Sequence, residues 1–326
     1  MSETKWNQTL EVACNRDYCT QCPTLMACLY TIVGVFCMIG NGMVLYAIYK
    51  TPYLQTVSNY FIASLAVADF SVGVLVNPFW AARSALSVWH NQHPLTVITA
   101  YMSMQTAVTT TFNLCAVSID RYVAITRPLH YERILTRRRC KIIIAIIWIL
   151  SFVLPIPRPL VTDPSKVSKI WMTGSTLVIL LPLIIITYCY YHIVREVKRH
   201  ISSIASINKW VSSLNDGVVT RKRNTKAAWT VAIVIGVFLV LWFPSLILTL
   251  LLALNKKVCD EEKLTRVWSF TVLVAFFSSA VNPLVYTARN QEYRNAFRSI
   301  FFNRGTKHDS TVAVISNSMT INERTF

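Results

Sequence analysis

Long uncharged stretches recur along the chain, and short segments that carry most of the charge separate them. Each stretch is near the roughly 20 residues that an α-helix needs to cross a bilayer. There are seven such stretches, at residues 22–49, 54–82, 91–119, 142–157, 170–194, 227–255 and 267–288. Only Asp69 interrupts the second one. The pattern predicts an all-α protein, a bundle of seven transmembrane helices with its two termini on opposite sides of the membrane.

Composition and charge agree with this fold and orient it. The chain of 326 residues is 54% hydrophobic and 14% charged, whereas an ordinary soluble domain is about a quarter charged. The segments after the first, third and fifth stretches, the C-terminal tail and Arg121 together hold 22 of the 32 Lys and Arg residues. Because basic loops stay in the cytoplasm, the N-terminus is predicted to be extracellular. The net charge of +17 is spread over these loops, which favours membrane lipid over nucleic acid as a partner.

The chain divides into four parts, namely an extracellular tail at 1–24, the bundle at 25–287, an amphipathic membrane-surface helix at 288–302 and a cytoplasmic tail at 303–326. The surface helix is expected because Tyr293, Phe297 and Phe301 recur every four residues beside two arginines. In the outer tail, Asn7 begins an Asn-Gln-Thr sequence that is typical of N-glycosylation.

Asp69 is the only acidic residue inside a predicted span, and a carboxylate at that depth is a functional-site candidate. A protonated packing residue is the alternative. Hydroxyl and amide side chains on other spans can surround it, namely Asn41 in the first, Thr110 in the third, and Ser278, Ser279 and Asn282 in the seventh. A carboxylate among such oxygens suits a small hard cation such as sodium. No other cofactor is expected.

Prolines lie within or near the middle of four predicted spans, where each removes a backbone donor and bends the helix. They are Pro78, Pro182, Pro244 and Pro283. Trp242 lies just before Pro244, and Phe238 lies one turn earlier. An aromatic pair beside a bend is typical of a hinge, and equally of ordinary core packing.

A pair of opposite charges, in the sequence Asp120-Arg121-Tyr122, directly follows the uncharged run at 91–119. The predicted topology places this pair at the cytoplasmic face. Charge at the end of a span costs little free energy when the two groups pair, but a carboxylate followed at once by an arginine indicates a role beyond solubility.

Motifs in all seven spans support a resemblance to a known family. They are Gly40-Asn41; Ser64-Leu65-Ala66-Val67-Ala68-Asp69; Asp120-Arg121-Tyr122 with Pro128-Leu129; Trp148; Pro182 and Tyr190; Phe238, Trp242 and Pro244; and Asn282-Pro283-Leu284-Val285-Tyr286. With these residues in this order, the chain resembles a rhodopsin-like (class A) G-protein-coupled receptor between residues 25 and 302. The resemblance implies a multi-pass plasma-membrane receptor. Its implied partners are a heterotrimeric G protein, arrestin, receptor kinases and an extracellular small-molecule or peptide ligand.

The resemblance implies roles for the cytoplasmic residues. Arg121 would be held by Asp120 in the inactive state and would reach toward Tyr190 and the G protein in the active state. Tyr286 would turn inward to support this change. Leu129 would insert into the G protein.

Other implied roles lie deeper in the bundle. Trp242 and Phe238 would couple the ligand cavity to an outward swing of the inner end of the sixth span. The sodium pocket of the family matches Asp69, Thr110, Ser279 and Asn282. Ser278 stands where an asparagine is common, so the resemblance does not decide its part in this pocket.

Two departures from the family pattern concern the outer half. The usual cysteine at the outer end of the third span is absent, so the common disulfide to the second extracellular loop cannot form. Outer cysteines exist elsewhere, and a bridge to Cys259 is expected with its partner left open among Cys14, Cys19 and Cys22. The third span also lacks the aspartate that binds the ammonium of monoamines, so a monoamine ligand is disfavoured.

The expected wall of the ligand cavity is mostly apolar and consists of Ser103, Met104, Ala107, Trp242, Leu246 and Phe276. A neutral or lipid-like molecule, or a peptide side chain, suits such a wall better than a cation does. Among receptors, adenosine-like, melanocortin-like and amine-like subtypes remain open.

Asn224 is a third departure, because many relatives carry a carboxylate at this position that helps to hold Arg121. Its absence predicts appreciable signalling without ligand. The principal alternative to a receptor is a transporter or channel, against which stand the lack of internal repeats and of a ring of pore-lining charges. No catalytic triad, glycine-rich phosphate loop or metal-ligand spacing indicates an enzyme.

Overall fold

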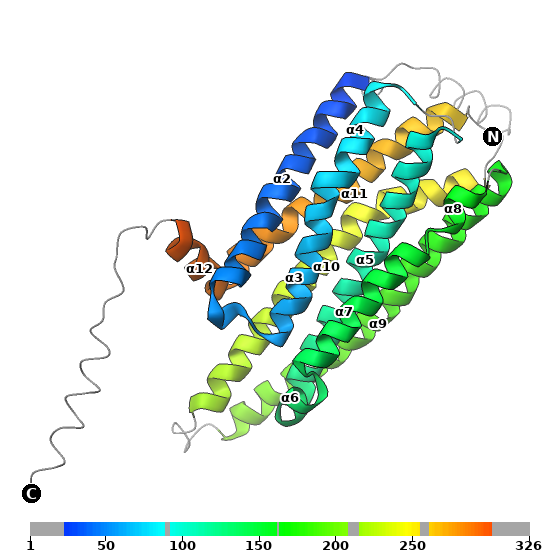
Figure 1. Ribbon diagram of the computed structural model, residues 1–326. Helices are drawn as coiled ribbons and strands as arrows, with labels where there is room; N and C mark the ends of the chain where they lie inside the picture. Colours follow the sequence, from blue (N-terminus) through cyan, green and yellow to red (C-terminus); the bar gives the residue numbers. More distant parts are fainter. Residues whose placement is uncertain (1–22, 89–91, 162, 208–214, 255–260, 302–326) are drawn as a thin grey trace, which may run out of the picture.

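The computed structural model describes residues 23–88, 92–161, 163–207, 215–254 and 261–301, which form a bundle of long helices (Figure 1). In chain order the helices are α2 (Pro23–Lys50), η2 (Pro52–Leu54), α3 (Val57–Ser71), η3 (Val72–Val76), α4 (Asn77–Ala85), α5 (Pro94–Thr126), η4 (Pro128–His130), α6 (Tyr131–Ile134), α7 (Arg137–Val153), α8 (Pro157–Leu160), α9 (Pro164–Ile207), α10 (Asn215–Leu254), α11 (Glu261–Arg289) and α12 (Gln291–Phe301). The described ranges contain no strand. The predicted all-α bundle is therefore confirmed.

Within these ranges, six predicted spans coincide with helices that are long and apolar enough to cross a membrane, namely α2, α3 to α4, α7 to α8, α9, α10 and α11. The remaining span, α5, is 33 residues long but richer in threonine and serine. It packs against α3, α4, α7, α8, α9 and α10, so that helices rather than lipid surround much of it. Its hydroxyls bond to its own backbone, as Thr111 Oγ1 does to the Ala107 carbonyl at 2.8 Å. An enclosed helix of this kind does not need the apolar surface that a lipid-facing helix needs.

The second span is a composite of α3, η3 and α4, and the break has a clear cause. Pro78 has no N–H group, so the backbone near it cannot keep the α-helical bonding pattern. The N–H of Asn77 bonds to the carbonyl of Val72, five residues earlier, and η3 is a π-helical segment. The expected bend at Pro78 thus takes the form of a π-bulge, a feature that often lies near functional sites.

The other three prolines lie where the sequence predicts them, inside α9, α10 and α11. At its C-terminal end α11 stops at Arg289, and Figure 1 shows α12 turned away from its axis. Tyr293 of α12 is fully buried, and its hydroxyl donates to Asn59 Oδ1 of α3 at 3.2 Å. The short helix expected after the seventh span is therefore present and packs against the bundle.

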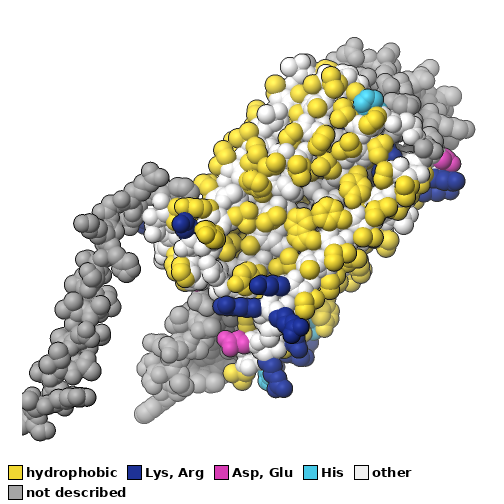
Figure 2. Space-filling model, in the orientation of Figure 1, with side chains coloured by type: hydrophobic (Ala, Val, Ile, Leu, Met, Phe, Trp, Pro, Cys, Tyr) yellow, Lys and Arg dark blue, Asp and Glu magenta, His cyan; other side chains and the backbone are white. Residues whose placement is uncertain are grey.

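The buried apolar residues form an inner and an outer core. The inner core includes Phe61, Leu114, Phe238 and Tyr286. The outer core lies between α2, α4 and α11 and centres on Trp80. Figure 2 shows that apolar side chains also cover most of the visible outside of the helices, as a lipid-facing surface requires.

Two glycines bring α2 and η3 into close contact. A Cβ atom on Gly73 would lie 2.6 Å from the carbonyl oxygen of Gly34, and a Cβ atom on Gly34 would lie 3.1 Å from Cβ of Asn77. Small residues that let helix backbones approach are a common device of membrane bundles. This contact fixes the distance between α2 and the helix that carries Asp69.

Gly73→Ala is expected to lower the stability of the protein, because backbone on both sides of the contact would have to move. Overpacking of this kind costs roughly 1–3 kcal/mol and would lower the melting temperature of the full chain in detergent. Gly236→Ala is the matched control, since no atom lies within 4 Å of its added Cβ and alanine is the better helix former. Equal melting temperatures for the two variants would contradict the close approach.

Candidate functional site

The charge pair near the C-terminal end of α5 is buried. Arg121 Nη2 lies 3.1 Å from Asp120 Oδ2, and the two side chains are 9% and 1% exposed. The same carboxylate accepts two further hydrogen bonds, from Ser58 Oγ to Oδ2 and from the Tyr131 hydroxyl to Oδ1, both at 2.7 Å. Hydrogen bonds to an ionised acceptor are about twice as strong as neutral ones. Both oxygens of Asp120 are therefore occupied, and by three different elements of the chain.

Local structure explains why these groups meet. Ser58 lies in the first turn of α3, whose start is capped by Thr56, because the Thr56 side chain accepts from the Asn59 N–H. Tyr131 opens α6, directly after the turn at η4. Burial, and next the charge of Asp120, raise the pKa of the Tyr131 phenol well above its usual range. At neutral pH this phenol keeps its proton and remains a donor to the carboxylate.

The tyrosines expected to meet Arg121 are bonded or packed elsewhere in this structure. The Tyr190 hydroxyl of α9 donates to the Ala228 carbonyl of α10 at 2.9 Å, which joins the two helices near their inner ends. Tyr286 is buried and stacks on Tyr293, with ring centroids 5.9 Å apart. Arg121 Nε makes no hydrogen bond to any described residue. Asp120 is thus the acidic partner of Arg121 in the described part of the chain.

The other residues predicted near the pair differ in their surroundings. The ring of Tyr122 lies 6.1 Å from that of Tyr188 on α9, whereas Leu129 in η4 is 94% exposed. Asn224 belongs to α10, but its side chain lies outside those that the structure describes. The prediction drawn from it therefore stays a prediction.

Part of the polar network expected around Asp69 is present at mid-bundle. Asp69 is fully buried, and Asn282 Nδ2 of α11 donates to its Oδ2 at 2.7 Å. Asn41 Nδ2 of α2 donates to the Ser279 carbonyl at 3.0 Å. Asp69 Oδ1 and Asn41 Oδ1 are buried and accept no hydrogen bond from the described residues. Buried oxygens in this condition leave coordination capacity for a cation or a water.

The remaining members of the expected sodium set differ in their surroundings. Ser279 lies beside the Asp69 carboxylate, and Thr110 is buried on α5. Ser278 is buried too, but its hydroxyl donates to the Ala275 carbonyl of its own helix at 2.7 Å. The Ser278 hydroxyl is therefore engaged away from Asp69.

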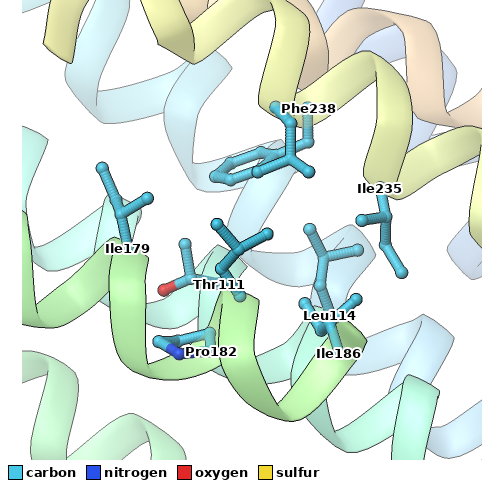
Figure 3. Close-up of a pocket in the computed structure, with 9 residues that line it drawn as sticks. Thr111, Leu114, Ile179, Pro182, Ile186, Ile235 and Phe238 are labelled. Atoms are coloured by element: carbon cyan, nitrogen blue, oxygen red, sulfur yellow. The ribbon is translucent and has the colours of Figure 1, made fainter. Parts of the chain in front are cut away.

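The aromatic pair of α10 lies above a small apolar gap between α5, α9 and α10. The ring centroids of Phe238 and Trp242 are 5.3 Å apart. Figure 3 shows Phe238 facing Thr111 and Leu114 of α5 and Pro182 of α9 across this gap. Its volume is about 10 Å³, which corresponds to about one water. The three helices consequently pack almost without space at the level of Pro182.

The expected ligand-cavity residues are distributed over two packed groups. Met104 and Ala107 are buried with Val178, and the partly buried Trp242 packs against them; Leu246 is half-buried on α10. Phe276 belongs to the outer core. Ser103 lies between the groups, because its hydroxyl accepts from Trp80 Nε1 at 3.0 Å.

Sequence reasoning missed Trp80 and Arg83, which organise the outer half. Arg83 is 1% exposed; its Nε donates to the Val88 carbonyl at 3.0 Å and its Nη1 to Thr99 Oγ1 at 3.2 Å. Its guanidinium lies 4.7 Å from the centre of the Trp80 ring. The predicted second span ended at residue 82 and so excluded this arginine, whereas α4 continues to Ala85.

Asn7, Cys14, Cys19, Cys22 and Cys259 lie outside the described residues.

Comparison with known proteins gives a consistent result. A family model described as 7 transmembrane receptor (rhodopsin family) matches residues 40–170 and 161–286. The alpha-1A adrenergic receptor of Oryzias latipes is 26% identical over 82% of this chain and 65% of its own length. The alpha-1D adrenergic receptor of Homo sapiens is 27% identical over 81% of this chain and 55% of its own length. The 5-hydroxytryptamine receptor 2C of Canis lupus familiaris is 29% identical over 82% of this chain and 69% of its own length.

The chain spans 55% of the length of one of these relatives and 65% and 69% of the others. The matched segments nevertheless include both polar sites, since Asp69, Asp120, Arg121 and Asn282 all lie within them. The family match also covers most of the membrane-spanning helices. This multi-pass membrane protein belongs to the rhodopsin family of seven-transmembrane receptors.

Proposed function

We propose that this protein is a class A receptor of the plasma membrane that transmits the binding of an extracellular ligand to heterotrimeric G proteins. Its N-terminus is extracellular, and arrestin and receptor kinases act on the same cytoplasmic face as the G protein. The observation that carries the proposal is the buried Asp120–Arg121 pair, since an arginine held at the inner end of a central helix is available to a partner only after the bundle opens.

The contacts indicate what opening requires. Arg121 must leave Asp120, and the inner end of α10 must separate from α9, which breaks the hydrogen bond from Tyr190 to Ala228. Tyr190 then becomes free to support Arg121. A ligand can drive this change only by its differential affinity for the open state, and the G protein favours the same state by linkage.

The outer half supports a ligand other than a monoamine, although the relatives are named as adrenergic and 5-hydroxytryptamine receptors. No Asp or Glu occurs between residues 91 and 119. A cation, Arg83, is instead buried beside Trp80 near the outer end of the bundle. A cationic ligand would therefore meet no carboxylate on α5 before Asp120.

The proposed sodium site supports regulation by monovalent salt. Asp69, Asn41, Ser279, Asn282 and Thr110 would hold the ion, and the two buried oxygens without hydrogen bonds fit that role. A bound cation would offset the charge of the buried carboxylate and stabilise the state in which the network is compact.

The experiment that tests the receptor function is nucleotide exchange on a panel of G proteins by the purified full chain, without ligand and with ligand panels. Asp120 is the acidic partner of Arg121 in the described part of the chain, and Asn224 stands where many relatives carry a second carboxylate. We therefore expect exchange without ligand to exceed that of protein-free membranes. Arg121→Ala should abolish it, whereas Lys50→Gln, which removes a positive charge from the exposed inner end of α2, should not. The absence of any exchange on all G proteins, with a folded chain, would contradict coupling.

Two variants of the clamp around Asp120 are expected to act in opposite directions. Asp120→Asn removes the charge that holds Arg121 and should raise exchange without ligand. Tyr131→Phe should lower exchange without ligand. Once Arg121 has left, the Asp120 carboxylate of this variant would have one hydroxyl donor fewer than in the wild-type chain, so opening would cost more free energy. A bond to a charged group is worth about 1.5–3 kcal/mol, so a change of roughly tenfold is expected.

The control for the second variant is Tyr53→Phe, because the exposed Tyr53 hydroxyl makes only a long bond of 3.5 Å to the Glu292 carbonyl. It should leave exchange unchanged. If Asp120→Asn and Tyr131→Phe shifted exchange in the same direction, the proposed division of roles around the carboxylate would be wrong.

Sodium chloride is expected to raise the melting temperature of the full chain relative to an equal concentration of potassium chloride. The shift should be roughly 2–4 °C and should disappear in Asp69→Asn, because stabilisation by a ligand requires its binding site. Ser278→Ala is the matched control, since that hydroxyl bonds to its own helix. A sodium effect that survives Asp69→Asn would rule out this site.

A further inference from the structure

An open depression lies at the cytoplasmic end of the bundle, between the end of α5 and the start of α7. It has a volume of about 580 Å³ and is lined by Arg127, His130, Arg133, Ile134 and Arg139. Figure 2 shows Lys and Arg side chains gathered at this end of the molecule, below the apolar surface of the helices. The proposed signalling mechanism does not use these lining residues.

The lining of the depression is strongly positive. It contains three arginines and a histidine, and no carboxylate. Arg139 Nη1 donates to the carbonyls of Arg133 and Ile134, at 3.1 and 2.9 Å, which fixes its guanidinium at the edge of the depression. In the described part of the chain, neither Arg127 nor Arg133 forms an ion pair. Glu132 of α6, an acid between His130 and Arg133 in the sequence, is exposed and does not line the depression.

The start of α7 adds to this positive field. The helix begins behind Thr136, and its first turn contains no acid but three consecutive arginines, Arg137, Arg138 and Arg139. The N-terminal end of a helix carries a partial positive charge, so cations there are unfavourable and an anion is favoured. The first turn of α7 supplies no acid to offset the repulsion among these three arginines. A bound anion would reduce that repulsion.

The position of the depression indicates where such an anion comes from. Ile142, Ile146 and Ile149 are 50%, 50% and 62% exposed. They follow Arg139 by 3, 7 and 10 residues, which places them on the same face of α7. This face is a lipid-facing apolar stripe of a helix that is long and apolar enough to span a membrane. An acyl chain lying on the stripe would bring its headgroup to the arginines at the end of it.

We infer that this depression is a binding site for an anionic phospholipid of the inner leaflet whose headgroup carries more than one negative charge. Arg127, Arg133 and Arg139 bind the headgroup phosphates, because the guanidinium fork matches phosphate oxygens in a bidentate way. The acyl chains lie along Ile142, Ile146 and Ile149. The inference depends on the membrane placement of α7 and not on G-protein coupling.

The test is native mass spectrometry of the full chain in detergent, titrated with phosphatidylinositol bisphosphate, phosphatidylserine or phosphatidylcholine. The bisphosphate lipid should bind most tightly. Arg127→Gln with Arg133→Gln should weaken its binding about a hundredfold, since each arginine–phosphate contact contributes about a factor of ten. Neither side chain makes a hydrogen bond within the described residues, so the fold should be unaffected.

Arg137→Gln with Arg138→Gln is the matched control, because it removes the same charge from side chains that do not line the depression. This pair should weaken binding only a few-fold. Equal losses for the two pairs would show diffuse attraction to a basic surface and would overturn the site. Binding of soluble inositol trisphosphate as tight as that of the lipid would overturn the assignment to a lipid.

Discussion

The buried carboxylate of Asp120 is the constraint on which its half of the bundle depends. A charge without water must be compensated by its neighbours, and here an arginine, a serine and a tyrosine share that task. These groups come from α5, α3 and α6, so the compensation of one charge also fixes how the connection between α5 and α7 lies against the bundle. Any partner that draws Arg121 away must also supply the free energy that the carboxylate then loses.

Much of the fold could be predicted from the sequence because its physical signals are local. Uncharged stretches located the helices, and Asp69 and Asn282 could be expected to meet because a single acid within a span requires polar neighbours. Ser58 and Tyr131 carry no such signal, since their contact with Asp120 depends on the register of α3 and on the path of a short connection. Arg83 was missed because a charge usually marks the end of a span, whereas its contacts with Thr99 and Trp80 allow it to be buried.

The two ends of the bundle differ in what they constrain. The end that carries Arg121 has a buried charge pair, a hydrogen bond between α9 and α10 and a depression lined by arginines. At the outer end, the residues expected to line one cavity belong to two packed groups joined through Trp80 and Ser103. A ligand that separates or bridges these groups would act on Trp242, and through Phe238 on the tightly packed gap beside Pro182.

The central claim is that release of Arg121 from Asp120 opens the inner end of α10. The direct measurement is a spin-label distance between Ile142 of α7 and Trp229 of α10, which are both exposed, in the wild-type chain and in Asp120→Asn. The account predicts that Asp120→Asn, without ligand, populates the longer distance that a G protein induces in the wild-type chain. If the G protein lengthened the distance and Asp120→Asn left the distribution unchanged, the pair would not be the restraint that opening removes.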